Sequence, residues 1–154
     1  MKLIGLEKGD YEILEDRYDP AEFFDAMIAK KETIDPHLKD IKDKKTILTH
    51  AKNMPEKSDR CNPCYSSRLE QAAKMASSKN IPYFTSTLLI SPKKDMDKLF
   101  ARGKEAEQKY PPTKFLRFDF RKNHGFTKAS QLTKKHQLRR QNYCGCGWTM
   151  PKEK

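Results

Sequence analysis

Long apolar runs are missing from this chain. No stretch approaches the ~20 consecutive apolar residues that a helix needs to cross a bilayer, so a membrane-spanning segment is not expected. The first residues offer only Leu3, Ile4 and Leu6 before charge resumes, so a secretory signal is not expected either. We therefore expect a cytoplasmic protein with no membrane partner.

Hydrophobic residues are also scarce. They make up 36% of the 154 residues, charged residues make up 34%, and the mean hydropathy is -0.95. An aromatic content of 10% argues against a fully disordered chain. We expect a single α/β domain over residues 1–154, and these values predict that its core is thin. Within it we expect a helical or irregular part with an insertion over 1–60, and a basic part that carries the cysteines over 61–154.

Acidic residues are few in the second half of the chain. Residues 1–60 carry 12 basic and 14 acidic side chains, whereas residues 61–154 carry 20 basic and 7 acidic ones. Between Arg121 and Tyr143 there are seven Lys or Arg and no Asp or Glu. This uneven positive field favours a polyanionic partner, of which nucleic acid is the commonest. The alternative is a solvated basic face that only aids solubility.

Hydrophobic periodicity predicts alternating helices and strands. Apolar residues at helical spacing and β-rich runs follow one another along the chain. Helices are expected over 19–29, 66–78, 94–109 and 127–137, strands over 83–90 and 114–120, and a linker or irregular insertion with a short helix near 47–51 over 30–60. This order predicts a Rossmann-like three-layer sheet with mostly parallel strands. Ligands of such sheets bind at the carboxyl ends of the strands.

Cysteine occurs only four times, as the pairs Cys61-x-x-Cys64 and Cys144-x-Cys146. In a cytosolic protein such close pairs more often bind metal or cycle between redox states than form structural disulfides. Four thiolates suit a zinc site, although 79 residues between the pairs exceed zinc-ribbon spacing. They also suit an iron–sulfur cluster. A third interpretation divides them into one metal-binding pair and one redox pair, whose small disulfide ring is readily reduced.

Several short motifs follow one another in a specific order. They are R-C-x-x-C-Y at 60–65, R-L-E at 68–70, F-T-x-T-L-L-x-S-P at 84–92, D-F-R at 119–121 and R-Q-N-Y-C-G-C at 140–146, with G-D-Y at 9–11 upstream. Together they resemble the QueH-type epoxyqueuosine reductases, over nearly the whole chain. The resemblance implies an oxidoreductase that removes the epoxide oxygen of epoxyqueuosine at the wobble position of tRNA, giving queuosine.

The resemblance also implies roles for individual residues. A [4Fe–4S] cluster takes Cys61 and Cys64 as ligands. Cys144 and Cys146 act as a redox-active dithiol, able to form a disulfide, or as ligands of a second iron beside the cluster. Apart from the resemblance, Asp119 lies at the end of a predicted strand, which makes it a candidate to donate a proton or bind metal; a salt bridge to Arg121 or Arg140 is the alternative.

The expected partners are the tRNA anticodon loop and an electron donor. The side chains predicted to contact the RNA are basic, with one aromatic that stacks on a base: Arg121, Lys122, Lys134, Lys135, Arg139, Arg140 and Tyr143. Trp148 is a second candidate to stack on a base. The alternative for both Tyr143 and Trp148 is that they pack around the metal site.

One departure from the family pattern concerns cluster ligation. Members begin with a strand that ends in C-C-x-P-C and supplies the remaining ligands, whereas this chain has no cysteine before Cys61. The chain therefore resembles an N-terminally shortened member that lacks the first strand. Three explanations are open: Cys144 and Cys146 complete the ligand set, a second chain supplies the missing strand, or the gene model is incomplete. The alternatives are a zinc-stabilised RNA-binding module and an inactive or split-enzyme fragment.

Overall fold

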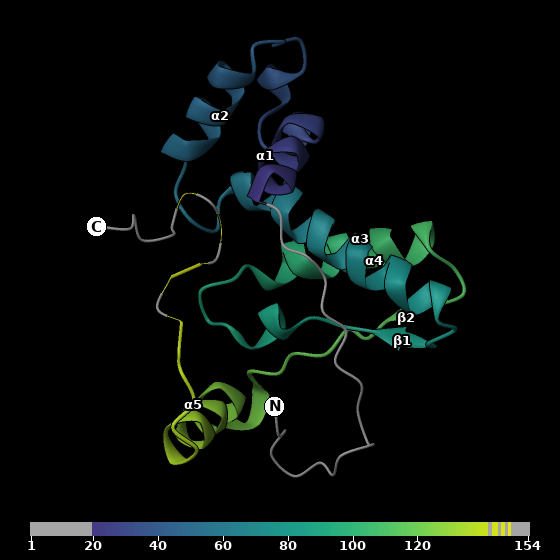
Figure 1. The fold of residues 1–154 in the computed structure, drawn as a ribbon, viewed down its shortest axis with the longest axis vertical. Coiled ribbons are helices and arrows are strands. Elements are labelled where there is room, and N and C mark those ends of the chain that lie inside the picture. The colour runs from purple at the N-terminus through teal and green to yellow at the C-terminus, as the bar shows by residue number, and fades with distance from the viewer. Residues whose placement is uncertain (1–19, 142, 145, 147, 149–154) are drawn as a thin grey trace.

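The computed structural model describes residues 20–141 and residues 143, 144, 146 and 148 (Figure 1). Its elements, in chain order, are α1 (Pro20–Ala29), η1 (Lys31–Thr33), η2 (Pro36–Leu38), α2 (Lys44–Asn53), η3 (Asp59–Cys61), α3 (Asn62–Ser78), β1 (Tyr83–Phe84), η4 (Thr87–Ile90), α4 (Met96–Lys109), β2 (Lys114–Phe115), η5 (Lys122–His124) and α5 (Gly125–Lys135). No helix in this part of the chain has the length and apolar character that a membrane crossing requires. The motif at 9–11 and the first residue of the predicted 19–29 helix lie outside the described residues.

The two strands form a parallel pair, with Tyr83 beside Lys114 and Phe84 beside Phe115. The chain crosses from β1 to β2 through η4 and α4, as parallel neighbours require. This confirms the predicted α/β class in its coarse form. Across the described residues the sheet has only these two strands, so a Rossmann-like three-layer sheet and a missing first strand stay predictions.

Both predicted strands are longer than the observed ones. β1 ends at Phe84, and the following residues form η4, where Ser86 Oγ accepts a hydrogen bond from the N–H of Leu88 (3.2 Å). Tyr83 is 61% exposed while Phe84 is buried, so this strand is covered on one face. The hydroxyl-rich stretch therefore caps a short helical turn and does not extend the sheet.

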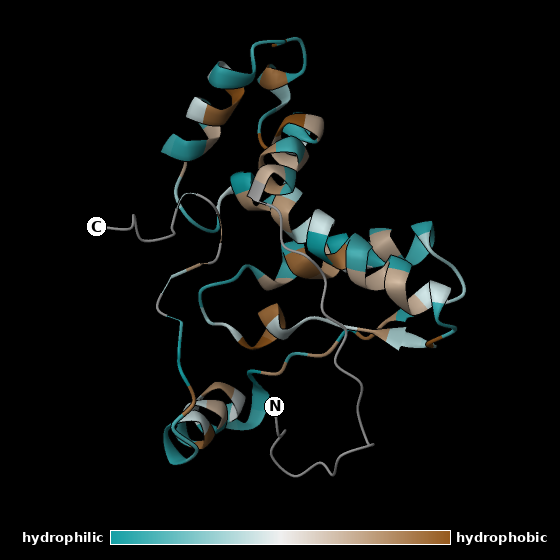
Figure 2. Ribbon diagram, viewed as in Figure 1, coloured by the Kyte–Doolittle hydropathy of each residue, from teal (hydrophilic) through white to brown (hydrophobic). Residues whose placement is uncertain are grey.

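The first of two hydrophobic cores lies between α3, α4 and the sheet. Apolar and hydrophilic positions alternate along these helices, which gives each of them one buried face (Figure 2). Its buried members are Tyr65, Leu69, Ala73, Ala76, Phe84, Leu89, Leu99, Ala106 and Phe115. The helices meet the sheet closely at Gly103, where an added Cβ would lie 2.3 Å from the Phe115 ring. This core confirms the helical periodicity expected for 66–78 and 94–109.

The second core is formed by α1, η1, η2 and α2, which cover the start of α3. Its buried members are Phe23, Met27, Ile34, Leu38, Ile47, Ala51 and Cys146. The short helix expected near 47–51 is present and extends over all of α2, where Asp43 caps the first turn by accepting a hydrogen bond from the N–H of Thr46 (2.8 Å). Residues 30–60 thus contribute to a core.

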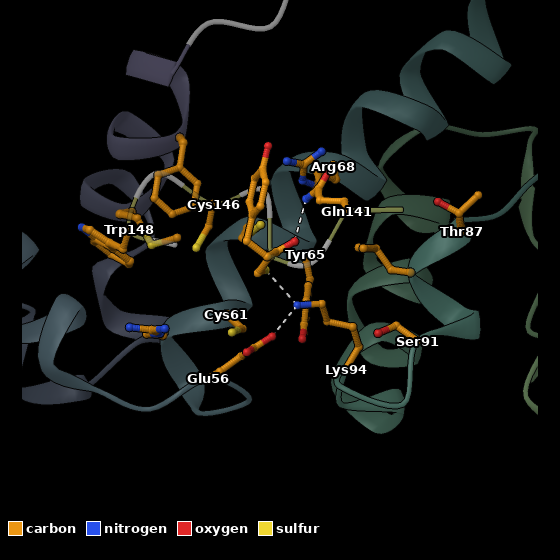
Figure 3. Close-up of a pocket in the computed structure, with 17 residues that line it drawn as sticks. Glu56, Cys61, Tyr65, Arg68, Thr87, Ser91, Lys94, Gln141, Cys146 and Trp148 are labelled. Carbon is orange, nitrogen blue, oxygen red and sulfur yellow. Dashed lines mark hydrogen bonds and ion pairs between the residues drawn. The ribbon is translucent and has the colours of Figure 1, made fainter. Parts of the chain in front are cut away.

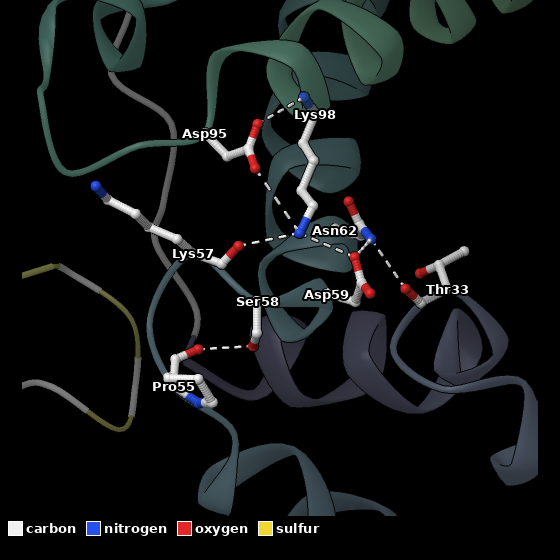
Figure 4. A network of polar contacts seen from close by, with 8 residues as sticks. All are labelled: Thr33, Pro55, Lys57, Ser58, Asp59, Asn62, Asp95 and Lys98. Atoms are coloured by element: carbon white, nitrogen blue, oxygen red, sulfur yellow. Dashed lines mark hydrogen bonds and ion pairs between the residues drawn. The ribbon is translucent and has the colours of Figure 1, made fainter.

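Polar contacts hold the amino end of α3 in place (Figure 4). Asn62 Nδ2 donates hydrogen bonds to the carbonyl oxygen of Thr33 (2.9 Å) and to Asp59 Oδ1 (3.1 Å). Lys98 of α4 pairs with the same Asp59 carboxylate (2.9 Å) and lowers its pKa. These contacts tie η1, η3 and α4 to the first turn of α3, which begins one turn earlier than predicted.

Glu70 joins three helices. Its carboxylate lies on α3 and pairs with Lys30, which directly follows α1, and with Lys109 at the end of α4 (2.7 Å). Burial opposes ionisation of Glu70, but the hydrogen bonds from Lys109 and Lys30 outweigh it and lower the pKa of this carboxyl. The ion pairs therefore stabilise the fold only while Glu70 is ionised.

We expect Glu70→Gln to destabilise the protein near neutral pH by about 1 kcal/mol or less. Because the folded-state pKa of Glu70 is lowered, its contribution is full above the unfolded-state pKa of about 4.3 and is lost as the pH falls through the folded-state value. Urea unfolding should show a larger difference at pH 7 than at pH 3.5. The control is Gln71→Ala on the same helix, which should change the free energy of unfolding equally at both pH values. A Glu70→Gln effect that is as large at pH 3.5 would refute this account.

Candidate functional site

All four cysteines line one cavity of about 280 Å³ (Figure 3). Cys61 and Cys64 reach it from the start of α3, while Cys144 and Cys146 reach it from the chain that follows α5. The structure thus brings together two pairs that lie 79 residues apart in the sequence. Other lining side chains are Glu56, Tyr65, Arg68, Ser91, Lys94 and Trp148.

The first pair lies at the boundary between the two cores. Cys61 ends η3 and packs against the first core, whereas Cys64, in the first turn of α3, packs against the second. Burial raises the pKa of the Cys64 thiol, although the guanidinium of Arg68 opposes this. A C-x-x-C pair at a helix start therefore presents both sulfur atoms to the same space.

The second pair is held against α1 by aromatic packing. Trp148 meets the ring of Phe23 edge-on, with 5.2 Å between centroids, and also packs on Phe24. The Arg60 guanidinium lies over the indole at 5.5 Å from its centroid. Cys146 is 8% exposed and belongs to the second core. Of the two uses expected for Trp148, packing beside the cysteines is therefore the observed one.

Lys94 brings a positive charge to the second pair. Its Nζ donates hydrogen bonds to Cys144 Sγ (2.8 Å) and to Glu56 Oε1 (2.8 Å), and the residue is 9% exposed. Burial would lower the pKa of Lys94, but these two hydrogen bonds raise it above its ordinary value. A hydrogen bond with the Cys146 side chain and burial raise the pKa of Cys144, which Lys94 opposes. The ammonium is thus a fixed charge beside the thiols.

The donor set suits a metal that prefers thiolates. None of the four cysteines is in a disulfide, so the Cys144–Cys146 disulfide is not formed in this state. Tyr65 adds a buried hydroxyl that lacks a hydrogen-bond partner among the described residues and lines the cavity. In the described part of the chain no three His, Cys, Asp or Glu side chains converge as a ready-made metal site. The cavity fits a polar, thiolate-bound group in its chemistry, and the sulfur atoms have to approach one another to hold it.

Apart from the cysteines and Trp148, Tyr143 is the one predicted site residue that lines the cavity. Asp119 is not among the residues that line the cavity, and it pairs with Arg121 (3.0 Å), which lowers the pKa of the carboxyl. This confirms the salt bridge considered as its alternative. Arg121, Lys122, Lys134, Lys135 and Arg139 lie before, within or after α5 and do not line the cavity either.

Sequence reasoning gave no role to Glu56, Lys94 or Tyr65. Glu56 stood in a stretch expected to be a linker, and Tyr65 entered only as one letter of a motif. Lys94 is indistinguishable by pattern from its neighbour Lys93, which is exposed. The signal that separates them is three-dimensional, because only one of two consecutive side chains turns toward the cysteines.

We predict that Trp148→Ala exposes Cys146. Removing the indole deletes two aromatic contacts of the second core, so the rate of alkylation of Cys146 in the metal-free, reduced chain should rise about tenfold. Mass spectrometry of iodoacetamide-labelled peptides gives the rate for each cysteine. The control Tyr83→Ala removes an exposed ring and should leave the rate unchanged. An unchanged Cys146 rate in Trp148→Ala would show that this ring does not hold the pair.

Comparisons with known proteins agree on one family. The family model for epoxyqueuosine reductase QueH matches residues 28–152. The chain is 33% identical over 111 residues to the protein named epoxyqueuosine reductase QueH from Histophilus somni, which covers 70% of this chain and 46% of that protein. For the proteins of the same name from Streptococcus pyogenes and Thermotoga maritima the identities are 37% over 92 residues and 36% over 105 residues.

The chain spans about half the length of these relatives or less, with 36% of the Streptococcus pyogenes protein and 54% of the Thermotoga maritima protein covered. The matched region nevertheless takes in both cysteine pairs and the elements from η1 to α5, while most of α1 precedes it. On the family match and these identities, the chain belongs to the epoxyqueuosine reductase QueH family.

Proposed function

We propose that this chain takes part in the reduction of epoxyqueuosine to queuosine in tRNA, as an oxidoreductase. The observation that carries the proposal is that four cysteines, none of them in a disulfide, line one cavity in a member of the QueH family. Removing the epoxide oxygen as water takes two electrons and two protons. A site with paired thiols and a nearby ammonium supports such chemistry, because thiols exchange electrons in pairs and a fixed charge steadies developing negative charge on oxygen.

In this proposal Cys61 and Cys64 hold a [4Fe–4S] cluster, and Cys144 and Cys146 act as a redox dithiol or hold a second iron. Bound there, the cluster would supply electrons one at a time. The chain's own groups supply the surroundings. Lys94 holds its positive charge against Cys144.

The proposed partners follow from the same chemistry. The tRNA anticodon loop supplies the substrate, a cytoplasmic electron donor supplies the reducing equivalents, and a second chain is one source of further cluster ligands. Reducing conditions in the cytoplasm keep paired thiols available. A role for Asp119 as a proton donor or metal ligand stays a proposal, and its ion pair with Arg121 argues against that role. Zinc bound to the same four thiols, in an RNA-binding module, is the competing proposal, because the donor set suits zinc equally well.

The test is anaerobic reconstitution of the full chain with iron and sulfide. We expect about four irons and four sulfides per chain with visible absorbance, and their loss in Cys61→Ala. Thr49→Ala on the exposed face of α2 is the control and should bind as much iron as the unaltered chain. The loaded protein should convert epoxyqueuosine in tRNA to queuosine when given dithionite, as measured by mass spectrometry of the nucleosides.

The outcomes separate the two proposals. A colourless protein that binds one zinc tightly, takes up no iron and leaves epoxyqueuosine unchanged would replace the reductase with the zinc-stabilised module. Iron binding that survives in Cys61→Ala would contradict the assignment of Cys61 as a cluster ligand.

A further inference from the structure

A second hollow of about 620 Å³ adjoins the cysteine cavity, and we name it the outer groove. The two share six lining residues, Glu56, Ser91, Lys94, Gln141, Tyr143 and Cys144. Four residues line the outer groove but not the cysteine cavity: Pro92, Lys93, Phe126 and Arg140. A molecule with one part in the cysteine cavity would therefore have its adjacent part in the outer groove.

The charge of the outer groove is positive. Lys93 and Arg140 are both exposed and both line it. Glu56 also lines it, but its carboxylate is paired with the Lys94 ammonium at 2.8 Å. Two cations open to solvent thus face a space whose carboxylate is already neutralised, which favours a phosphate.

The outer groove also offers aromatic faces. Phe126 is 40% exposed, a large fraction for a phenyl ring, and the Arg140 guanidinium lies 5.9 Å from its centroid. Tyr143 stands where the two hollows join, and its carbonyl oxygen accepts a hydrogen bond from Gln141 Nε2 (2.7 Å). Exposed rings beside cations are the surface on which proteins stack unpaired bases.

A turn before α4 separates the roles of two consecutive lysines. The N–H of Lys93 donates to Ser91 Oγ (3.3 Å), and the N–H of Lys94 donates to the Ser91 carbonyl oxygen (3.3 Å). Within this turn Lys94 is buried against Cys144 and Lys93 is exposed at the outer groove. The same short segment therefore contributes lining residues to both the cysteine cavity and the outer groove.

We propose that the outer groove binds the nucleotide next to the base that enters the cysteine cavity. Lys93 and Arg140 contact its phosphate, and its base stacks on Phe126. The ligand is a single-stranded RNA loop, because bases held in an A-form duplex cannot be splayed onto a protein ring. The inference rests on the proposed function and deepens it, since it assigns the contact with the substrate to particular residues.

This assignment differs from the charge pattern of the sequence. Lys134 and Lys135 lie in the last turn of α5 and do not line the outer groove, although they are part of the same basic stretch. Lys93 lies outside that stretch and does line it. The groove, and not the density of positive charge, selects the contact residues.

The test measures binding apart from reduction. A fluorescein-labelled anticodon stem-loop with an unmodified wobble guanine is titrated with the full chain over a range of salt concentrations, and anisotropy gives Kd. Lys93→Gln should weaken binding and reduce the salt slope by about 0.7, the value for one lost phosphate contact on a single strand. Phe126→Ala should weaken binding about tenfold or more and leave the salt slope unchanged.

Two controls accompany these variants. Lys74→Gln, an exposed lysine of α3 that does not line the outer groove, should leave Kd unchanged, and circular dichroism checks that each variant is folded. A blunt RNA duplex of the same length should bind with a Kd that Phe126→Ala does not alter.

The binding measurements test this inference separately from the proposed function. Unchanged binding in both groove variants, or an equal loss for the duplex and the loop, would overturn the inference even if the protein reduces epoxyqueuosine. Weakened loop binding in both variants supports it even if the reconstituted protein proves inactive, in which case the proposed function alone fails.

Discussion

The packing of the amino end of α3 between two hydrophobic cores is the constraint on which the site depends. The first core pairs α3 with α4 and the sheet, and the second covers the start of α3 with α1 and α2. Cys61 and Cys64 lie where these cores meet, one against each. The chain after α5 returns to the second core, so both cysteine pairs reach one cavity (Figure 1).

The cavity combines opposing influences on its thiols. Burial raises the pKa of Cys64, and the hydrogen bond to Cys146 together with burial raises that of Cys144. Lys94 and Arg68 act in the other direction by placing positive charge beside the sulfur atoms. These two cations therefore offset part of the effect by which burial disfavours the thiolate forms.

Much of the helical structure was predictable from the sequence, because apolar residues at helical spacing mark one buried face. The helices over 66–78 and 94–109 follow from this rule, and they appear as α3 and α4. The strands were overestimated, because a run of β-branched and hydroxyl residues also suits a capped turn such as η4. The helix α2 was expected only as a short helix near 47–51, because most of its residues are polar and the burial of Ile47 and Ala51 is visible only in the packed structure.

The site was predictable in part. Spacing identified the two cysteine pairs, and the motifs placed the chain in its family, which the comparisons confirm. The roles of the cysteines stay proposals. Charge density along the sequence could not separate Lys93 from Lys94, or Arg140 from Lys134, because the groove that distinguishes them is formed by segments far apart in the chain.

The most direct test of this account is chemical cross-linking of the two cysteine pairs. The reduced, metal-free chain is treated with dibromobimane, a short reagent that joins neighbouring thiols, and the digested peptides are identified by mass spectrometry. The account predicts links between Cys61 or Cys64 and Cys144 or Cys146, in addition to links within each pair. Links only within each pair, at every reagent concentration, would contradict the convergence of the four thiols on one cavity.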